Sequence, residues 1–199
     1  MPRIEPIPWE KLKPAQRERM EAGLKSGAFT DVMPLQILAY AEHDAPPDDG
    51  DRHPNFPNSL LGGRLLEFLR IRSAQLGGCA PCSASRKSEG ATEEIVACLA
   101  NPSLSDDLTV RERLALDYLE RLATDHHSID GETYRRLAEH FTLAEILELG
   151  LTCAPMIGMH RLMHTLDIYG DAPPALAYDP AQVGVTWEAL HGAPAVAAE

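Results

Sequence analysis

Hydrophobic positions along most of the chain recur every three to four residues, the spacing of amphipathic helices. Cap and stop residues around these runs predict helices over 14–25, from Asp31, over 59–76, 92–99, 109–122 and 131–140, and from Thr142 to about Tyr169. Pro155 is expected to kink or interrupt the last of them. No alternating, β-branched run reaches strand length, so the pattern predicts an all-α fold of seven or eight helices.

The segments between these helices predict one domain that spans residues 1–199. Residues 1–58 supply an N-terminal arm, two helices and a loop of four prolines and four aspartates from Asp44 to Ser59. Residues 59–170 form the helical core, and residues 171–199 form a Pro- and Ala-rich C-terminal arm. A loop as long as 44–59 is often functional or mobile.

The helix expected over 59–76 carries one carboxylate in an unusual place. Its leucines share a wide arc of the helical wheel, and Glu67 lies on the opposite side. That side is itself partly apolar, so we expect Glu67 to be partly buried. The simplest interpretation is an ion pair with Arg64 or Arg70 on the same helix. A general base or a proton-relay group is the functional alternative.

Composition narrows the classes of partner. The chain of 199 residues carries 18 basic and 30 acidic side chains, a formal net charge of -12, which disfavours nucleic acid and anionic membrane surfaces. The first residues lack the apolar core of a signal peptide, and no run of 18 apolar residues predicts a membrane span. We therefore expect a cytoplasmic protein, where four cysteines do not form a structural disulfide framework.

Two of the cysteines, Cys79 and Cys82, are separated by two residues and follow the glycines that end the 59–76 helix. At the start of a helix this spacing brings both sulfurs within disulfide reach, and the unpaired N–H groups favour a thiolate. One cysteine can then attack a peroxide or disulfide while the other resolves the product. Half of a zinc site, with His160 and His164 as further ligands, and a pair of inert thiols remain alternatives.

A longer stretch of sequence resembles the alkyl hydroperoxide reductase D-like (AhpD-like) branch of the carboxymuconolactone decarboxylase superfamily. The resemblance covers roughly Leu60 to Leu162. Three features carry it. The stretch LLEFLRIRSAQLGGCAPCSASRKSEG contains a glutamate twelve residues before the first cysteine and the Cys-x-x-Cys pair, and the segment EHFTLAEILEL follows later in the chain.

This resemblance implies a compact all-α fold assembled as trimers or hexamers, with thiol peroxidase or disulfide reductase activity. It also implies that Cys82 meets the peroxide, Cys79 resolves it and Glu67 belongs to the proton relay. Helix-terminus physics alone would instead make Cys79 the more acidic thiol. The reductant would be a small thiol or a lipoyl protein, and no metal or organic cofactor is expected.

The sequence departs from the family pattern where that pattern has histidines. Arg86 stands four residues after Cys82, and Pro81 stands just before it. Arginine can stabilise a thiolate, but it does not pass protons at neutral pH. We therefore expect the thiol chemistry, with Arg86 tuning the thiols, and an altered proton shuttle.

Two other classes of function stay open. One is a lactone enzyme of the decarboxylase branch with structural thiols, although that branch generally lacks the cysteine pair. The other is a non-catalytic oligomeric binding protein, with or without zinc. Cys98 and Cys153 have apolar neighbours in sequence and are expected to be small buried hydrophobes.

Overall fold

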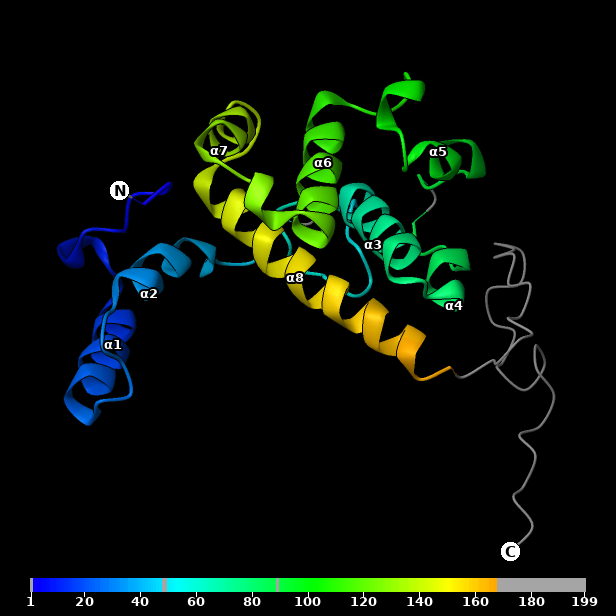
Figure 1. The fold of residues 1–199 in the computed structure, drawn as a ribbon. Coiled ribbons are helices and arrows are strands. Elements are labelled where there is room, and N and C mark those ends of the chain that lie inside the picture. Colours follow the sequence, from blue (N-terminus) through cyan, green and yellow to red (C-terminus); the bar gives the residue numbers. More distant parts are fainter. Residues whose placement is uncertain (1, 48–49, 89, 168–199) are drawn as a thin grey trace, which may run out of the picture.

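The computed structural model describes residues 2–47, 50–88 and 90–167, and within these ranges the chain is helical and contains no strand (Figure 1). This confirms the predicted all-α class. The eight helices are α1 (Pro14–Ser26), α2 (Met33–Leu38), α3 (Gly63–Gly77), α4 (Ala80–Ala84), α5 (Glu93–Cys98), α6 (Val110–Thr124), α7 (Gly131–Ala138) and α8 (Leu143–Thr165). Short 3-10 turns lie at Trp9–Lys11, Ala39–Ala41, Pro102–Leu104 and His126–Ser128.

Helix α3 is the centre of the main core. It packs against α8, α6 and the short α4 (Figure 1), and most of its residues are buried. Leu66, Phe68, Leu69 and Ile71 have no exposed surface. Removing each such side chain from water contributes roughly 1.5–3 kcal/mol. The helix that carries Glu67 is therefore also the one that the fold surrounds most completely.

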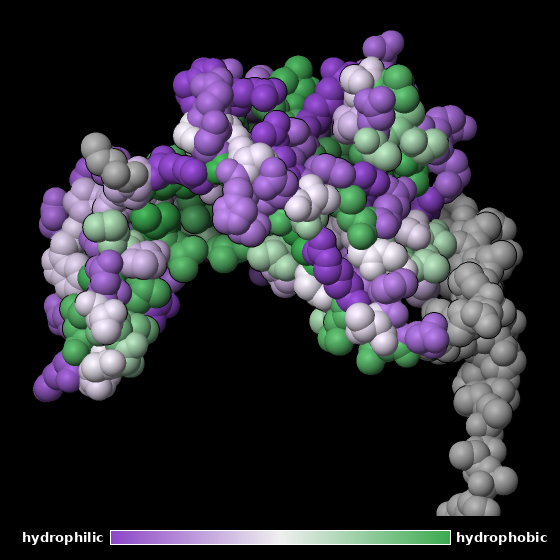
Figure 2. Space-filling view, in the orientation of Figure 1, coloured by the Kyte–Doolittle hydropathy of each residue, from purple (hydrophilic) through white to green (hydrophobic). Residues whose placement is uncertain are grey.

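The N-terminal helices form a separate arm. In Figures 1 and 2, α1 and α2 extend away from the body, and apolar surface lines the hollow between this arm and α8. A small cluster of its own, with Leu12, Met20 and Ala39 buried, stabilises the arm. The His43 Nε2 atom lies 3.0 Å from the Glu148 carboxylate of α8 and joins the arm to the body.

Two predicted capping boxes are present, and one predicted helix start is wrong. Thr109 with Glu112 caps α6, and Thr142 with Glu145 caps α8. Helix α3 begins at Gly63 and not at residue 59. The hydroxyl of Ser59 donates to the Glu148 carboxylate of α8 and accepts from the Leu61 N–H at 3.1 Å, but the chain becomes helical only after Gly62.

A sharp turn precedes α3. Gly62 has φ +81°, in the left-handed region that favours glycine. The N–H of Gly63 donates to the Asp51 carbonyl at 2.8 Å, and the N–H of Arg64 donates to the Asp51 carboxylate at 3.0 Å. Asp51 thus caps the start of α3, although it lies more than ten residues before the helix in the sequence.

Helix α8 is continuous through Pro155, so Pro155 does not interrupt it, and the alternative of a kink stays a prediction. Proline removes one N–H, which leaves the Leu151 carbonyl without its helical partner. Leu151 is exposed, and solvent can hydrogen-bond there. The predicted end near Tyr169 and the C-terminal arm 171–199 lie outside the described residues. None of the helices in the described ranges is long and apolar enough to cross a membrane.

The start of α3 gives a testable prediction about the close approach of the chain at residues 52–53. A Cβ at Gly63 would lie 2.9 Å from the backbone carbon of Arg52 and from the backbone nitrogen of His53. Because backbone atoms cannot rotate away, Gly63→Ala should lower the unfolding free energy by about 1–3 kcal/mol in urea denaturation. Gly158→Ala in α8 meets no atom within 4 Å and should raise it by up to about 1 kcal/mol. Equal stability of both variants would contradict the described approach.

Candidate functional site

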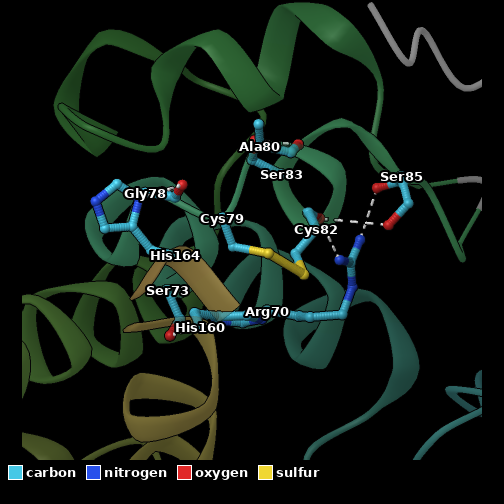
Figure 3. Close-up of a disulfide and its surroundings, with 10 residues drawn as sticks. All are labelled: Arg70, Ser73, Gly78, Cys79, Ala80, Cys82, Ser83, Ser85, His160 and His164. Atoms are coloured by element: carbon cyan, nitrogen blue, oxygen red, sulfur yellow. Dashed lines mark hydrogen bonds between the residues drawn. A yellow bond between two sulfur atoms is a disulfide. The ribbon is translucent and has the colours of Figure 1, made fainter. Parts of the chain in front are cut away.

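The two cysteines lie at the junction of α3 and α4. Gly78, with φ +71°, ends α3, and Cys79 is the N-terminal cap residue of α4. The Ser83 N–H donates to the Cys79 carbonyl at 2.9 Å, which closes the turn that brings Cys82 back towards Cys79. The two sulfurs are joined in a disulfide, with a Cα–Cα distance of 5.3 Å (Figure 3). The predicted disulfide reach is confirmed.

The two cysteines differ in exposure. Cys79 is buried, with 2% of its surface accessible, whereas Cys82 is half-buried. Cys82 also lines a pocket, which Cys79 does not. Exposure at this site therefore favours Cys82 as the cysteine that meets a reactant, which is the order that the family resemblance implies.

The Cys82 pocket has a volume of about 460 Å³. It is formed by the loop before α3, by α3, by the α4 segment and by α8. Its lining residues are Asn55, Phe56, Arg70, Pro81, Cys82, Ser85, Lys87, Pro155, Met156, Met159 and His160. A volume of this size suits a small organic molecule.

Beneath the pocket lies a fully buried carboxylate. Glu67 has no exposed surface, and its oxygens accept hydrogen bonds from Arg70 Nε at 2.7 Å and from Arg70 Nη2 at 2.8 Å. They also accept from the Lys87 N–H at 2.6 Å and contact His53 Nε2 at 3.0 Å. The partner on α3 is therefore Arg70, while Arg64 pairs with Glu112 on α6. The partial burial expected for Glu67 is complete burial in the structure.

Hydrogen bonding fixes the state of His53. The Asn55 N–H donates to His53 Nδ1 at 3.1 Å, so this nitrogen carries no proton. The proton is then on Nε2 and is donated to Glu67. His53 is neutral in this arrangement, and the charges of Glu67 and Arg70 balance.

Burial alone raises the pKa of the Glu67 carboxyl. The hydrogen bonds from Arg70 and His53, the positive charge of Arg70 and the Lys87 N–H outweigh that effect and lower the pKa to about 2. The carboxylate is therefore ionised throughout the neutral range. A group with so low a pKa holds its neighbours in place but is a weak general base.

Arg70 connects this buried network to the cysteines. Its Nη1 donates to the Cys82 carbonyl at 2.5 Å and its Nη2 to the Ser85 carbonyl at 2.7 Å (Figure 3). The last turn of α4 is thus fastened to α3 by one guanidinium. Glu67 acts on Cys82 through Arg70 and the backbone, and not by contact with the sulfur.

The hydrogen-bond partners of Arg86 are Glu93 and backbone carbonyls near the cysteines. Its guanidinium donates to both carboxylate oxygens of Glu93, at 2.9 and 3.0 Å, and to the carbonyls of Ser83 and Ser85. It is not among the residues that line the pocket. In these contacts Arg86 joins the end of α4 to α5.

The two histidines of α8 have different surroundings. His160 is buried, its Nδ1 lies 3.0 Å from the Ser73 hydroxyl of α3, and its ring lines the Cys82 pocket. Burial, with the charge of Arg70, lowers the pKa of His160 to about 4, so the ring is neutral at neutral pH. His164 is exposed and contacts the Gly78 carbonyl at 3.2 Å. Figure 3 labels both residues in the surroundings of the disulfide.

The remaining cysteines are separate from the pair. Cys153 is fully buried in α8, and burial raises the pKa of its thiol to about 12, as expected for a small buried hydrophobe. Cys98 is half-buried at the end of α5. Within the described ranges, no group of three or more His, Cys, Asp or Glu side chains is placed to hold a metal ion.

Sequence reasoning missed His53, His160 and Lys87 as members of the site. His53 comes from the long loop over 44–59, whose length was the only sequence signal. His160 was noticed for its spacing to His164, and the structure instead pairs it with α3. Arg70 was named only as a possible ion-pair partner of Glu67.

No family model, no curated protein and no solved structure matches the chain.

The buried ion pair gives a prediction for stability and its pH dependence. Glu67→Gln leaves the Arg70 cation buried without its counter-charge, so the unfolding free energy should fall by about 3 kcal/mol at pH 7. Because the Glu67 pKa is lowered from 4.5 to about 2, its ionised form stabilises the fold above pH 4.5. That contribution should be lost as the pH falls from 4.5 to 2, and Glu67→Gln should lack this part of the acid dependence.

Glu93→Gln is the matched control for this measurement. Glu93 pairs with Arg86, but its side chain is 73% exposed, so its removal should change the unfolding free energy by less than about 1 kcal/mol. Denaturant titrations between pH 2 and 8 compare both variants with the parent protein. Equal effects of the two substitutions would contradict a structural role for the buried pair.

Proposed function

We propose that the chain is a thiol-dependent oxidoreductase that reduces hydroperoxides or disulfides with Cys79 and Cys82. The observation that carries this proposal is that the two sulfurs are paired beside a pocket, and that of the two cysteines Cys82 lines this pocket while Cys79 does not. A buried partner and an accessible partner are what a resolving and an attacking thiol require. Membership of the AhpD-like branch is part of the proposal and rests on the sequence resemblance.

The reaction divides into two steps. In the first, the Cys82 thiolate attacks the outer oxygen of a hydroperoxide, the O–O bond breaks, and a sulfenic acid forms at Cys82 while the alkoxide takes up a proton and leaves as an alcohol. In the second, the Cys79 thiolate attacks the Cys82 sulfur, and hydroxide leaves as water after it takes up a proton. An external dithiol then returns two electrons and two protons to the disulfide, and a small thiol or a lipoyl protein fits that role.

His160 supports the proposal as the group that exchanges hydrogen bonds with the reactant. Of the nitrogen-bearing side chains in the pocket wall, Arg70 is always charged and is held by Glu67 and two carbonyls. His160 is neutral at neutral pH, and its Nδ1 is anchored on Ser73. Its ring therefore brings a neutral nitrogen to the wall that Cys82 shares, in place of the histidines missing at positions 81 and 86.

The proposed thiol chemistry gives a prediction with distinct outcomes for each cysteine. Treatment of the reduced protein with one equivalent of an organic hydroperoxide should remove two of its four thiols and give one intramolecular disulfide, measured by thiol titration and peptide mass spectrometry. Cys82→Ser should abolish hydroperoxide consumption, because it removes the attacking sulfur. Cys79→Ser should stop at the sulfenic acid, which dimedone traps at Cys82.

Cys98→Ser and Cys153→Ser are the controls, and both should retain hydroperoxide consumption. Sulfonic acid at Cys82, or no change at either cysteine, would contradict the proposal. Activity on a carboxylated lactone that survives replacement of both Cys79 and Cys82 by serine would favour the lactone enzyme instead.

We also propose that the protein is a homo-oligomer, as the resemblance implies. One face of α8 supports this, because Leu151, Met159, Leu162 and Leu166 are each about half exposed and follow one another at helical spacing. Apolar surface also lines the hollow beside α8 (Figure 2). Contiguous apolar surface of this kind is typical of a protein–protein contact.

The oligomer gives a prediction in solution. Leu162→Glu should shift the mass measured by light scattering after size exclusion towards the 21.8 kDa monomer. Leu104→Glu replaces an even more exposed leucine, 71% accessible and far along the chain from α8, and should leave the assembly intact. A monomeric parent protein would contradict this part of the proposal.

A further inference from the structure

The charge of the Cys82 pocket differs from that of the whole chain. The protein carries a formal net charge of -12, yet among the residues that the structure describes no carboxylate lines the pocket. Two cationic side chains, Arg70 and Lys87, do line it. The pocket is therefore locally basic in an acidic protein, which is the pattern expected where an anionic group is received.

The two cations are not equivalent. Arg70 is buried and neutralised by two hydrogen bonds from its guanidinium to Glu67, and two further N–H groups donate to the carbonyls of Cys82 and Ser85, so four of its five donors are used. Arg70 therefore has little capacity left for a ligand. Lys87 is exposed, and no carboxylate in the described part of the chain lies within ion-pair distance of it.

Lys87 is nevertheless held in place. Its backbone N–H donates to the buried Glu67 carboxylate at 2.6 Å, which fixes where its side chain starts. Its ammonium donates to the Asn55 side-chain oxygen at 3.4 Å, a long contact across to the loop before α3. An ammonium and an amide thus lie together in the pocket wall, and both can donate hydrogen bonds to a carboxylate.

The rest of the wall is apolar. Phe56 comes from the loop, Pro81 from α4, and Pro155, Met156 and Met159 from α8. Methionine side chains adapt to different apolar shapes. The wall therefore fits a molecule with an apolar body, while the reactive sulfur and the ammonium are its two chemical contacts.

We propose that the pocket binds hydroperoxides or disulfides that join an apolar body to a carboxylate, with the carboxylate at Lys87 and Asn55 and the O–O or S–S bond at Cys82. This inference rests on the proposed function of the cysteine pair and adds its substrate class. Lys87 is the specificity-determining residue. The carboxylate is unchanged by the reaction, since it is held away from the bond that breaks.

A pair of substrates that differ only in charge tests the inference. The reduced protein is mixed with a long-chain fatty acid hydroperoxide or with its methyl ester, and the rate of thiol loss at Cys82 is measured at several concentrations. The acid should react about tenfold faster at low concentration, as expected for one charge-assisted hydrogen bond. Added salt should reduce this preference.

Substitutions of lysine assign the preference to one position. Lys87→Gln should bring the ratio of the acid rate to the ester rate close to one, and Lys87→Glu should reverse it. Lys25→Gln removes an exposed lysine of α1 outside the pocket and should keep the preference of the parent protein. Thermal unfolding of the three variants separates a loss of recognition from a loss of folding.

The outcomes distinguish a failure of the proposed substrate class from a failure of the proposed thiol peroxidase function. If acid and ester react equally, or if Lys87→Gln keeps the preference, the substrate class is wrong while the thiol chemistry stands. If neither hydroperoxide oxidises Cys82, the peroxidase function fails. The anion site is then tested by the rates at which Cys82 reacts with the dianionic 5,5′-dithiobis(2-nitrobenzoate) and the neutral 2,2′-dithiodipyridine. Their ratio should fall in Lys87→Gln, and an unchanged ratio would overturn the inference.

Discussion

The ion pair between Glu67 and Arg70 is the interaction on which the candidate site depends. A carboxylate with no exposed surface is costly unless every oxygen is hydrogen-bonded, and here four donors supply that bonding. These donors come from three places in the chain: the loop at His53, helix α3 and the segment after α4 at Lys87. One buried charge therefore determines how a long loop, the central helix and the cysteine turn lie relative to one another.

The same pair determines which parts of the site are rigid. Arg70 also donates hydrogen bonds to the Cys82 and Ser85 carbonyls. These bonds hold the last turn of α4 against α3, although α4 has only five residues. A helix this short has little stability of its own. Cys82 is thus positioned through its carbonyl by the Arg70 guanidinium, while the adaptable methionines of α8 form part of the apolar side of the pocket.

Local signals in the sequence predicted the local features of the site. The spacing of Cys79 and Cys82, the glycines that end α3, and the capping boxes of α6 and α8 each depend on residues within a few positions of one another. The semi-apolar side of the helical wheel predicted burial of Glu67. The predicted start of α3 at residue 59 was wrong because Asp51, which lies 13 residues before Arg64 in the chain, caps the first turn of the helix, and Ser59 does not. The placement of His53 and of His160, which meets Ser73 across 87 residues, required the tertiary structure for the same reason.

The buried groups around the disulfide have a consequence for how the site responds to its surroundings. Against the opposing effect of burial, hydrogen bonds and the charge of Arg70 lower the pKa of Glu67 to about 2, and burial lowers the pKa of His160 to about 4. Across the neutral range Glu67 therefore stays ionised and His160 stays neutral. These two groups keep a constant electrostatic background beside the sulfurs, and neither of them serves as a sensor of physiological pH.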